Sequence, residues 1–316
     1  MTDQGLVSVV IIFKDEERFL REAITGVLAQ TYGRWEILLV DDGSSDDSPD
    51  IAREFARREG GRIRYLEHAG HSNCGMSASR NLGIRDSRGE FVAFLDGDDV
   101  WRSDHLAVCV DILNRFDDAD MTYGRNLYWY SWEGSAARQL DRLPSHWFRA
   151  DRVVEAPELL ARFLTGRASL PCPSSMVVRN RALQEVGGFL DTFRTLYEDQ
   201  AFLARFCLVR PVFVSNRCTS LYRQHAGATC ALAAKQGEIE AAQARYYDWL
   251  ESMLEQAGAC GHELRDAARV ARRLANGPHA DWCTRIARTR VRLRQYGFAA
   301  LDRLADRCRP ARGVSR

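Results

Sequence analysis

The chain has 316 residues, of which 46% are hydrophobic and 28% are charged, and its formal net charge at pH 7 is +1. This composition is typical of a globular enzyme, and a near-neutral chain gives no overall electrostatic case for binding nucleic acid or an anionic membrane. The nine cysteines contain no Cys-x-x-Cys pair, which predicts reduced thiols and argues against a disulfide framework or a zinc site.

Strand and helix patterns alternate through the first part of the chain. Apolar runs predict strands over residues 7–13, 35–40, 63–66 and 91–95. Apolar residues spaced by three and four predict helices over residues 19–28, 48–55, 76–85 and 103–116. This alternation predicts an α/β fold with a mostly parallel sheet covered by helices.

The pattern changes after residue 120. An aromatic strand is predicted over residues 121–132, followed by a less regular stretch to about Pro173. Strands are then predicted over residues 175–179 and 212–215, with a helix over residues 198–208 between them. Beyond Thr229 the composition shifts towards Ala, Arg, Glu and Gln with helical periodicity, which predicts a main domain over residues 1–229 and an α-helical C-terminal extension over residues 230–316.

The aromatic strand ends in Tyr128-Trp129-Tyr130-Ser131-Trp132. These rings suit a platform on which a sugar stacks. Alternating aromatic residues in a strand more often mean one buried and one half-exposed face, so we favour the packing interpretation.

Two acidic clusters each follow an apolar strand: Asp41-Asp42-Gly43-Ser44 and Asp96-Gly97-Asp98-Asp99. The carboxyl ends of parallel strands lie at the edge of the sheet where open α/β folds bind ligands. Asp and Ser are also favoured in turns and at helix starts, and Asp-Gly is a tight-turn signal, but a turn does not need three acids within four positions. Converging carboxylates repel one another unless a cation lies between them, so the clusters favour a metal-bound nucleotide site.

Six ordered blocks resemble the pattern of glycosyltransferase family 2, which has the GT-A fold. They are residues 7–12, 28–32, 40–44, 79–83, 94–99 and 197–199. The resemblance spans residues 7 to about 227 and implies an inverting glycosyltransferase that moves a sugar from a nucleotide-diphosphate donor, a UDP-sugar, to an acceptor hydroxyl. One departure is Ile12-Phe13-Lys14-Asp15, where the family usually has Pro, a small residue, an aromatic residue and Asn.

The resemblance also implies roles at the nucleotide. Asp42, with Asp41 beside it, would contact the nucleoside, and Phe13 would pack against the base. Arg80 would support the nucleotide from the next helix, and Asp96 would face the ribose or the sugar.

The metal and the catalytic base are implied in the same way. Asp98, with Asp96, matches the Asp-x-Asp motif that ligates Mn²⁺ or Mg²⁺ on the diphosphate. Asp199 matches the general base that deprotonates the acceptor, with Glu198 as its neighbour. Acids at this position also suit the first turn of a helix, where they complement its dipole.

Tyr222-Arg223-Gln224-His225 resembles an Arg-x-His segment found in parts of the family. There the His225 position completes the metal shell and the Arg223 position faces phosphates. A lone histidine is as often an ordinary surface residue as a ligand.

Two other functions remain open from the sequence: a sugar nucleotidyltransferase and a non-catalytic nucleotide- or sugar-binding module. The general base at Asp199 argues against both, because neither needs one. The expected partners are a nucleotide-sugar donor and a saccharide or lipid-linked acceptor, without nucleic acid.

The expected location is the cytoplasm, with peripheral attachment at the inner membrane face as an alternative. The apolar run over residues 7–13 stops at Lys14, too soon for a secretory signal, and no run approaches the roughly 18 apolar residues that span a bilayer. A basic segment between Pro278 and Cys308 suits either an anionic lipid surface or packing on the main domain or a partner. We favour packing, because its apolar and basic positions are not cleanly separated.

Overall fold

The computed structural model describes residues 5–146 and 148–275. The predicted basic segment between Pro278 and Cys308 therefore lies outside the described residues. Within the described ranges, no helix combines the length and the apolar character needed to cross a bilayer.

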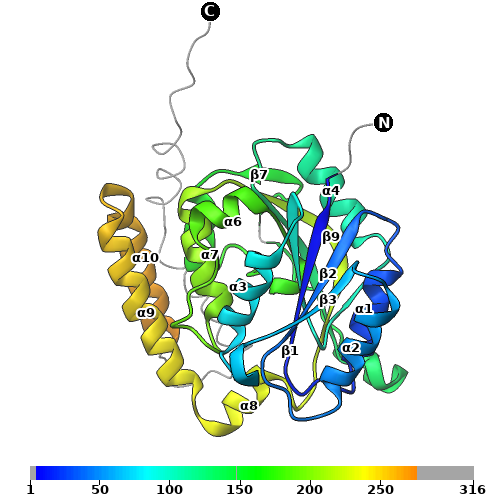
Figure 1. Cartoon of the computed structure of the whole chain (residues 1–316). Coiled ribbons are helices and arrows are strands. Elements are labelled where there is room, and N and C mark those ends of the chain that lie inside the picture. The colour runs from blue at the N-terminus through cyan, green and yellow to red at the C-terminus, as the bar shows by residue number, and fades with distance from the viewer. Residues whose placement is uncertain (1–4, 147, 276–316) are drawn as a thin grey trace, which may run out of the picture.

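A curled sheet of nine strands forms the centre of the described chain (Figure 1). Its order is β3-β2-β1-β4-β8-β6-β9-β5, with β7 also paired to β9. The pairs β3–β2, β2–β1, β1–β4 and β6–β9 are parallel, whereas β8, β5 and β7 run antiparallel to their neighbours. The predicted α/β fold with a mostly parallel sheet is confirmed. The strands are β1 (Val7–Phe13), β2 (Trp35–Asp41), β3 (Ile63–Glu67), β4 (Phe91–Asp96), β5 (Val100–Trp101), β6 (Met121–Trp129), β7 (Arg152–Val154), β8 (Met176–Arg179) and β9 (Val212–Arg223).

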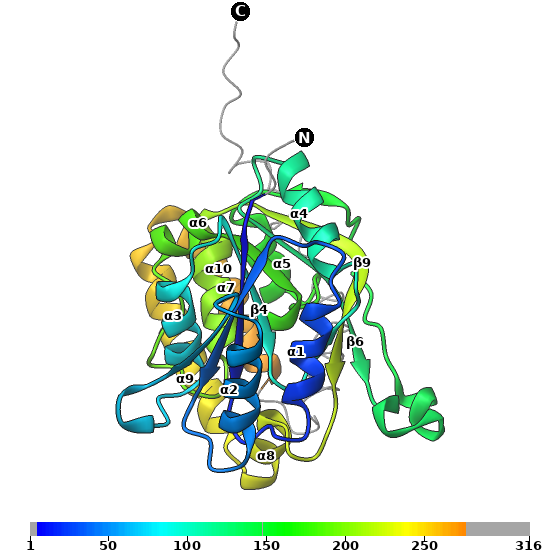
Figure 2. The ribbon, with the colours of Figure 1, turned by 45° about the vertical axis from the view of Figure 1, so that its right-hand side comes forward.

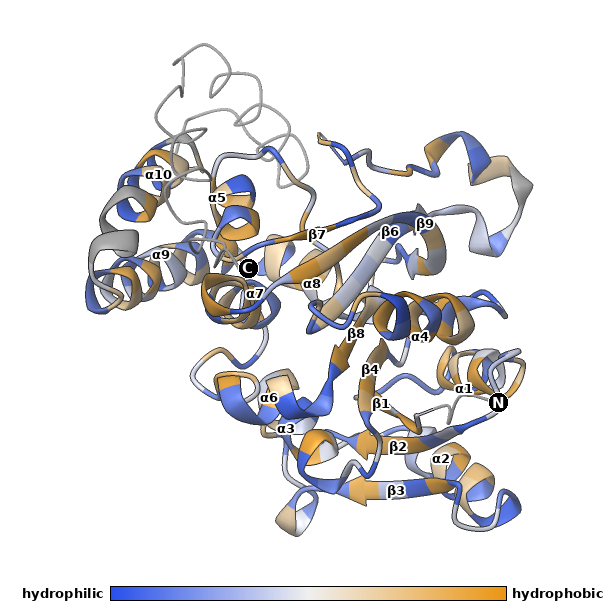
Figure 3. Cartoon of the chain, turned by 90° about the horizontal axis from the view of Figure 1, so that it is seen from above, coloured by the Kyte–Doolittle hydropathy of each residue, from blue (hydrophilic) through white to orange (hydrophobic). Residues whose placement is uncertain are grey.

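Helices cover both faces of the sheet (Figure 3). One face carries α1 (Leu20–Leu28), α2 (Ser48–Arg58) and α4 (His105–Arg115). The other carries α3 (Met76–Asp86), α5 (Glu158–Leu164), α6 (Asn180–Val186), α7 (Glu198–Val209), α9 (Ile239–Gln256) and α10 (Ala259–Ala275). A short helix, α8 (Thr229–Gln236), lies at the lower edge of the molecule in Figures 1 and 2.

Successive residues of the buried strands contribute to opposite faces. Val10 and Ile12 of β1 belong to one apolar cluster, whereas Val9 and Ile11 belong to the other. This is the period-two alternation of a strand, with both sides apolar because both are covered. All seven residues of β1 are buried, as a continuous apolar run predicts.

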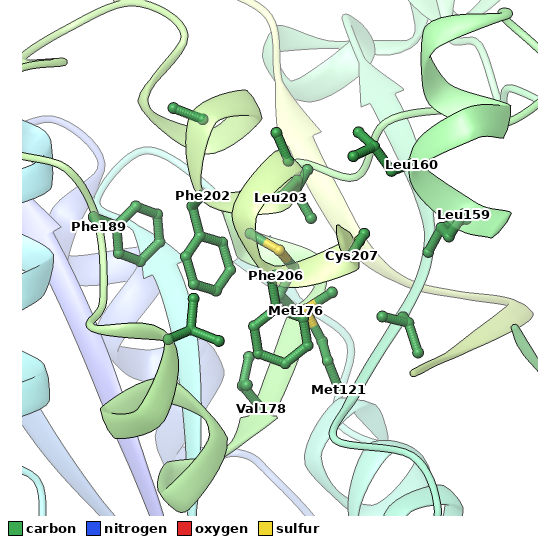
Figure 4. Close-up of a cluster of buried hydrophobic side chains, with 14 of the residues drawn as sticks. Met121, Leu159, Leu160, Met176, Val178, Phe189, Phe202, Leu203, Phe206 and Cys207 are labelled. Atoms are coloured by element: carbon green, nitrogen blue, oxygen red, sulfur yellow. The ribbon is translucent and has the colours of Figure 1, made fainter. Parts of the chain in front are cut away.

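Helix α7 is the central element of the larger cluster. Phe202 and Phe206 of α7 lie against Met176 and Val178 of β8, with Leu160 of α5 nearby (Figure 4). Its apolar residues keep α7 against the sheet. Because its first turn carries Glu198 and Asp199, this packing also decides where those acids lie.

The helical segment after residue 238 packs on the α/β part of the chain. Tyr246 and Leu250 of α9 and Leu264 of α10 belong to the same buried cluster as α7. The ring of Tyr246 stacks on that of Tyr197 with centroids 5.0 Å apart. One apolar cluster thus continues across the boundary predicted at residue 230, and the division into two domains stays a prediction.

The structure differs from the sequence analysis in two stretches. The region expected to be irregular contains β7 and α5. Strand β9 extends to Arg223, well beyond the predicted residues 212–215. Asn216 and Arg217 interrupt the apolar pattern there, and the pairing with β6 shifts register at the same level.

Candidate active site

A cavity of about 730 Å³ opens at the carboxyl edge of the parallel strands. Phe13 at the end of β1 pairs with Asp41, and Ile12 pairs with Asp96, so the ends of β2 and β4 flank the end of β1. The cavity is lined by seven of the residues that the sequence singled out: Phe13, Asp42, Asp96, Asp98, Glu198, Asp199 and His225. Loop, strand and helix ends from distant parts of the chain therefore meet in one place.

The two neighbouring acids after β2 lie in different surroundings. Asp42 lines the cavity, and its carboxylate accepts hydrogen bonds from the backbone N–H groups of Cys74 at 2.7 Å and Gly75 at 3.0 Å. Asp41 is fully buried and is not among the lining residues. Its carboxylate accepts from the backbone N–H of Ser44 at 2.9 Å and from the hydroxyl of Tyr65 at 2.8 Å. Of the pair, Asp42 is the one placed to meet a ligand, and Asp41 supports the loop.

Asp98, His225 and Glu16 form a group that could hold a metal ion. Nε2 of His225 lies 3.0 Å from Oδ2 of Asp98, and one ligand atom from each of the three residues lies within 4.8 Å of the others. Burial raises the pKa of Glu16 to about 8, and the nearby charges of Asp98 and Asp96 add to this effect. Two carboxylates and one imidazole are a donor set that fits Mn²⁺ or Mg²⁺.

Glu16 is not among the ligands predicted from the sequence. It belongs to the acidic run Lys14-Asp15-Glu16-Glu17, which marks only where the first strand stops. Its position in the sequence could have predicted it, because this run follows the carboxyl end of a buried strand, as the other two acidic clusters do.

Arg80 lies beneath the cavity and links two of its walls. Its side chain is 1% exposed, and it donates to Oδ1 of Asp96 at 2.7 Å and to Oε1 of Glu198 at 3.2 Å. Arg80 is not a lining residue. It is therefore placed to position the two carboxylates, and a direct contact with a nucleotide stays a prediction.

Glu198 and Asp199 form the acidic first turn of α7. Burial raises the pKa of Asp199 to about 6 and that of Glu198 to about 8, and the charge of Asp199 adds to the shift of Glu198. The preceding residue, Tyr197, has a φ of +65°, a left-handed conformation that is uncommon for a bulky residue. Such backbones often occur at functional sites, where the surrounding packing holds them.

Arg223 and Asp99 fix the Asp-x-Asp loop through hydrogen bonds. The Asp99 carboxylate accepts from the hydroxyl of Ser174 at 2.5 Å and from the backbone N–H of Arg223 at 2.9 Å. The guanidinium of Arg223 donates to the carbonyl of Asp98 at 2.7 Å and to Glu22 at 2.6 Å. Arg223 is not a lining residue of the cavity, and its contact with the diphosphate stays a prediction.

Two rings of the aromatic run pack around this arginine. The Arg223 guanidinium lies 4.7 Å from the ring centroid of Trp129 and 5.2 Å from that of Trp132. The indole N–H of Trp132 donates to the carbonyl of Gln224 at 2.9 Å. Both rings thus have packing partners of their own, as the packing interpretation expects.

Comparison with protein families identifies the class. The family model described as "Glycosyl transferase family 2" matches residues 8–187, which is more than half of the chain. The chain therefore belongs to glycosyltransferase family 2, as its six sequence blocks predict.

Curated relatives match parts of the chain. An uncharacterized glycosyltransferase, EpsJ of Bacillus subtilis (strain 168), is 43% identical over 94 residues, 30% of this chain and 26% of EpsJ. The succinoglycan biosynthesis protein ExoW of Rhizobium meliloti (strain 1021) is 31% identical over 208 residues, 64% of this chain and 62% of ExoW. Each match spans less than two thirds of the relative.

Solved structures share the fold at low sequence identity. Residues 1–349 of S. aureus TarS, in complex with UDP-GlcNAc, align with a TM-score of 0.63 at 15% identity, covering 95% of this chain and 83% of that one. The mannosyltransferase PcManGT from Pyrobaculum calidifontis, in complex with GDP-Man and Mn²⁺, aligns with a TM-score of 0.54 at 14% identity, covering 96% and 86%. These likenesses establish the GT-A fold of the chain.

Proposed function

We propose that the protein is an inverting, metal-dependent glycosyltransferase that moves a sugar from a UDP-sugar to an acceptor hydroxyl. One observation carries the proposal. The group of Asp98, His225 and Glu16, which suits a divalent cation, and the partly buried carboxylate of Asp199 line the same cavity at the carboxyl edge of the sheet.

The nucleoside belongs at the end of β1 and β2. Asp42 offers carboxylate oxygens to a base or ribose, and the ring of Phe13 lies in the same wall. Support for uridine comes from family resemblance and from the TarS complex with UDP-GlcNAc, whereas PcManGT was solved with GDP-Man. The identity of the base is therefore part of the proposal.

The diphosphate belongs beside Asp98, His225 and Glu16, which would hold Mn²⁺ or Mg²⁺. A divalent cation bound there would neutralise the negative charge that develops on a departing nucleoside diphosphate. Without a cation, the carboxylates of Asp96 and Asp98 would lie beside the diphosphate and repel the anionic donor. Arg80 and Arg223 do not need to contact the donor to contribute. Arg80 bonds to the side chain of Asp96 and Arg223 bonds to the backbone carbonyl of Asp98, so together they hold the Asp-x-Asp loop in place.

The acceptor is activated by Asp199. A hydroxyl that attacks the anomeric carbon must lose its proton, and a nearby carboxylate can accept it. A pKa of about 6 makes Asp199 a stronger base than an ordinary aspartate while leaving it ionised at neutral pH. Glu198, held by Arg80 at 3.2 Å, positions the first turn of α7. A single base and a direct displacement produce inversion.

The test is a thermal-shift panel of nucleotide-sugars with and without Mn²⁺, followed by product analysis. A selective shift that requires Mn²⁺, together with transfer of the sugar and an inverted anomeric centre by NMR, is expected. Pyrophosphate released with formation of a nucleotide-sugar would indicate the nucleotidyltransferase instead. Binding without transfer or hydrolysis of any donor would indicate a non-catalytic module.

A further inference from the structure

A second cavity, of about 550 Å³, lies next to the candidate active site. Tyr197 and Gln200 line both cavities, and they flank the proposed base, Asp199, in the chain. We infer that this second cavity binds the carrier of the acceptor, an apolar group joined to the acceptor sugar through a phosphate. We call it the carrier cavity. The inference rests on the proposed function and names the acceptor class.

The walls of the carrier cavity are largely apolar. They come from β6, the segment before β7, α5, α7, α9 and α10. The size is within the range of pockets that enclose most of a small organic ligand. A free saccharide, which carries a hydroxyl on almost every carbon, would leave many of its hydroxyls unpaired against such walls. The apolar lining residues include Leu143, Leu160, Phe163, Leu164, Leu170, Leu203 and Ala204.

The charge of the carrier cavity is opposite to that of the active site. Its lining residues include Arg125, Arg142 and His146 and, among the described residues, no Asp or Glu. The first cavity is lined by nine acidic residues, from Asp15 to Asp199, and needs a cation before it suits a phosphate. The carrier cavity can accept a negative group without one.

Arg125 is placed to receive that group. Its Nε donates to the carbonyl of Pro144 at 3.0 Å and Nη2 to that of Leu143 at 3.2 Å. Within the described ranges no carboxylate lies within 4 Å of its guanidinium nitrogens, so its positive charge is not neutralised by an ion pair. Guanidinium groups bind phosphate oxygens through paired N–H donors.

Two buried polar atoms also point to an oxygen-bearing ligand. The hydroxyl of Tyr123, whose side chain is 1% exposed, has no hydrogen-bond partner within the described structure, and neither has Nδ1 of His146. Both residues line the carrier cavity, with ring centroids 5.9 Å apart. Nε2 of His146 donates to the carbonyl of Ser215 at 3.0 Å, which leaves Nδ1 as an acceptor. Buried polar atoms are nearly always paired, so these two favour a ligand with polar atoms over a pure hydrocarbon.

The decisive experiment compares three acceptors that carry the same sugar: the free saccharide, its decyl glycoside and its decyl phosphate derivative. We expect the KM to fall in that order, with the phosphate-linked acceptor about tenfold below the decyl glycoside. Arg125→Gln should raise the KM of the phosphate-linked acceptor by a similar factor, several times more than it raises the KM of the neutral glycoside. Equal KM values for all three acceptors would overturn the inference while leaving the proposed transferase intact.

A matched pair of leucines tests the apolar part. Leu143 lines the carrier cavity and is 38% exposed, whereas Leu140 is 53% exposed and is not a lining residue. Leu143→Ser should raise the KM of both decyl acceptors, and Leu140→Ser should not. An equal effect of the two substitutions contradicts the inference.

Binding can be measured without any transfer. Decyl phosphate alone, below its micelle concentration, should bind the full-length protein by calorimetry, and Arg125→Gln should weaken this binding. The failure of decyl phosphate to bind overturns the carrier assignment even when the donor assays succeed. Conversely, decyl phosphate binding by a protein that turns over no donor would refute only the proposed function.

Discussion

Asp199 is partly buried and lines the cavity. Its Oδ1 accepts the backbone N–H of Gln200 at 2.7 Å, and no ion pair neutralises its carboxylate in the described structure. Asp199→Asn keeps this shape but cannot accept the acceptor proton. We expect the substitution to lower turnover by about 10²–10⁴-fold, with donor affinity unchanged. Steady-state kinetics and nucleotide binding measure the two effects, and normal turnover would exclude Asp199 as the base.

The pH profile gives a second measure of the same residue. Burial raises the pKa of Asp199 to about 6, with Asp96 adding to it and Arg80 opposing it. A base works only when deprotonated, so kcat/KM should rise with pH to a plateau above about 6. An acid limb near the ordinary aspartate value of about 4 would show that another group titrates.

Glu16 offers a test of the metal group. Glu16→Gln removes a carboxyl group that can ionise to bind a cation from the set of Asp98, His225 and Glu16, so Mn²⁺ affinity should fall about tenfold or more. Glu17→Gln is the matched control. It makes the same substitution at the next residue, whose carboxylate instead accepts the backbone N–H of Asp47 at 3.0 Å. Calorimetry with the metal alone should separate the two, and equal affinities would remove Glu16 from the metal group.

At the residue scale, the sequence predicts best those residues that follow directly after a predicted strand or begin a predicted helix. Asp42, Asp98 and Asp199 all line the first cavity, as expected from motifs placed after strands or at a helix start. The surroundings of Arg223 could not be foreseen. Its burial depends on Glu22, which is 201 positions away in the chain, and on the carbonyl of Asp98. Long-range pairs of this kind leave no local pattern.

At the scale of elements, the first residue of α4 shows how buried polar groups affect stability. His105 is fully buried, its ring stacks on that of Trp101 with centroids 4.2 Å apart, and its Nδ1 lies 2.8 Å from the hydroxyl of Thr219. Burial lowers its pKa to about 3, because the charged imidazolium would lose its water. The packing of α4 against β5 and β9 therefore requires a neutral ring.

This gives a stability prediction with a definite sign. The unfolded chain binds a proton at His105 below pH 6.5, whereas the folded chain does not until about pH 3. The free energy of unfolding should therefore fall by about 1.4 kcal/mol per pH unit from this group as the pH drops below 6.5. Urea unfolding at pH 7 and pH 5 should show a smaller loss for His105→Gln than for the unchanged protein. Equal losses would mean that His105 does not contribute.

The elements that the sequence predicts well are those with a clear period. Strand β1 and helix α3 lie within a residue of their expected bounds, since each carries a continuous or regular apolar pattern. Strand β7 and helix α5 were not foreseen. Each is short, and their order comes from pairing with β9 and from packing on α7, contacts that no local pattern encodes.

At the scale of the molecule, α9 and α10 share one apolar cluster with the sheet and α7. Leu250 in α9 is fully buried in that cluster. Leu250→Ala should lower the free energy of unfolding by about 2–5 kcal/mol, as truncation of a buried leucine typically does. The shift should appear equally in far-UV circular dichroism and tryptophan fluorescence, because one apolar cluster joins the helices to the sheet. Ser252→Ala, at an exposed position of the same helix, is the control.

Two separate transitions, with only one of them moved by Leu250→Ala, would instead favour an independent helical domain after residue 230. The pattern of composition alone cannot decide between these outcomes, because a helix packed on a domain and a helix within a separate domain have the same periodicity.

Tyr197 and Gln200, which line both cavities, have a consequence for how such an enzyme can diversify. The family model ends at residue 187, whereas Gln243, Tyr247 and Ala271 of the second cavity belong to helices beyond it. Substitutions in those helices can reshape the second cavity without changing the residues at the ends of β1, β2 and β4. If the second cavity binds the carrier as we infer, a lineage could exchange one recipient molecule for another while its donor chemistry stays inherited and unchanged.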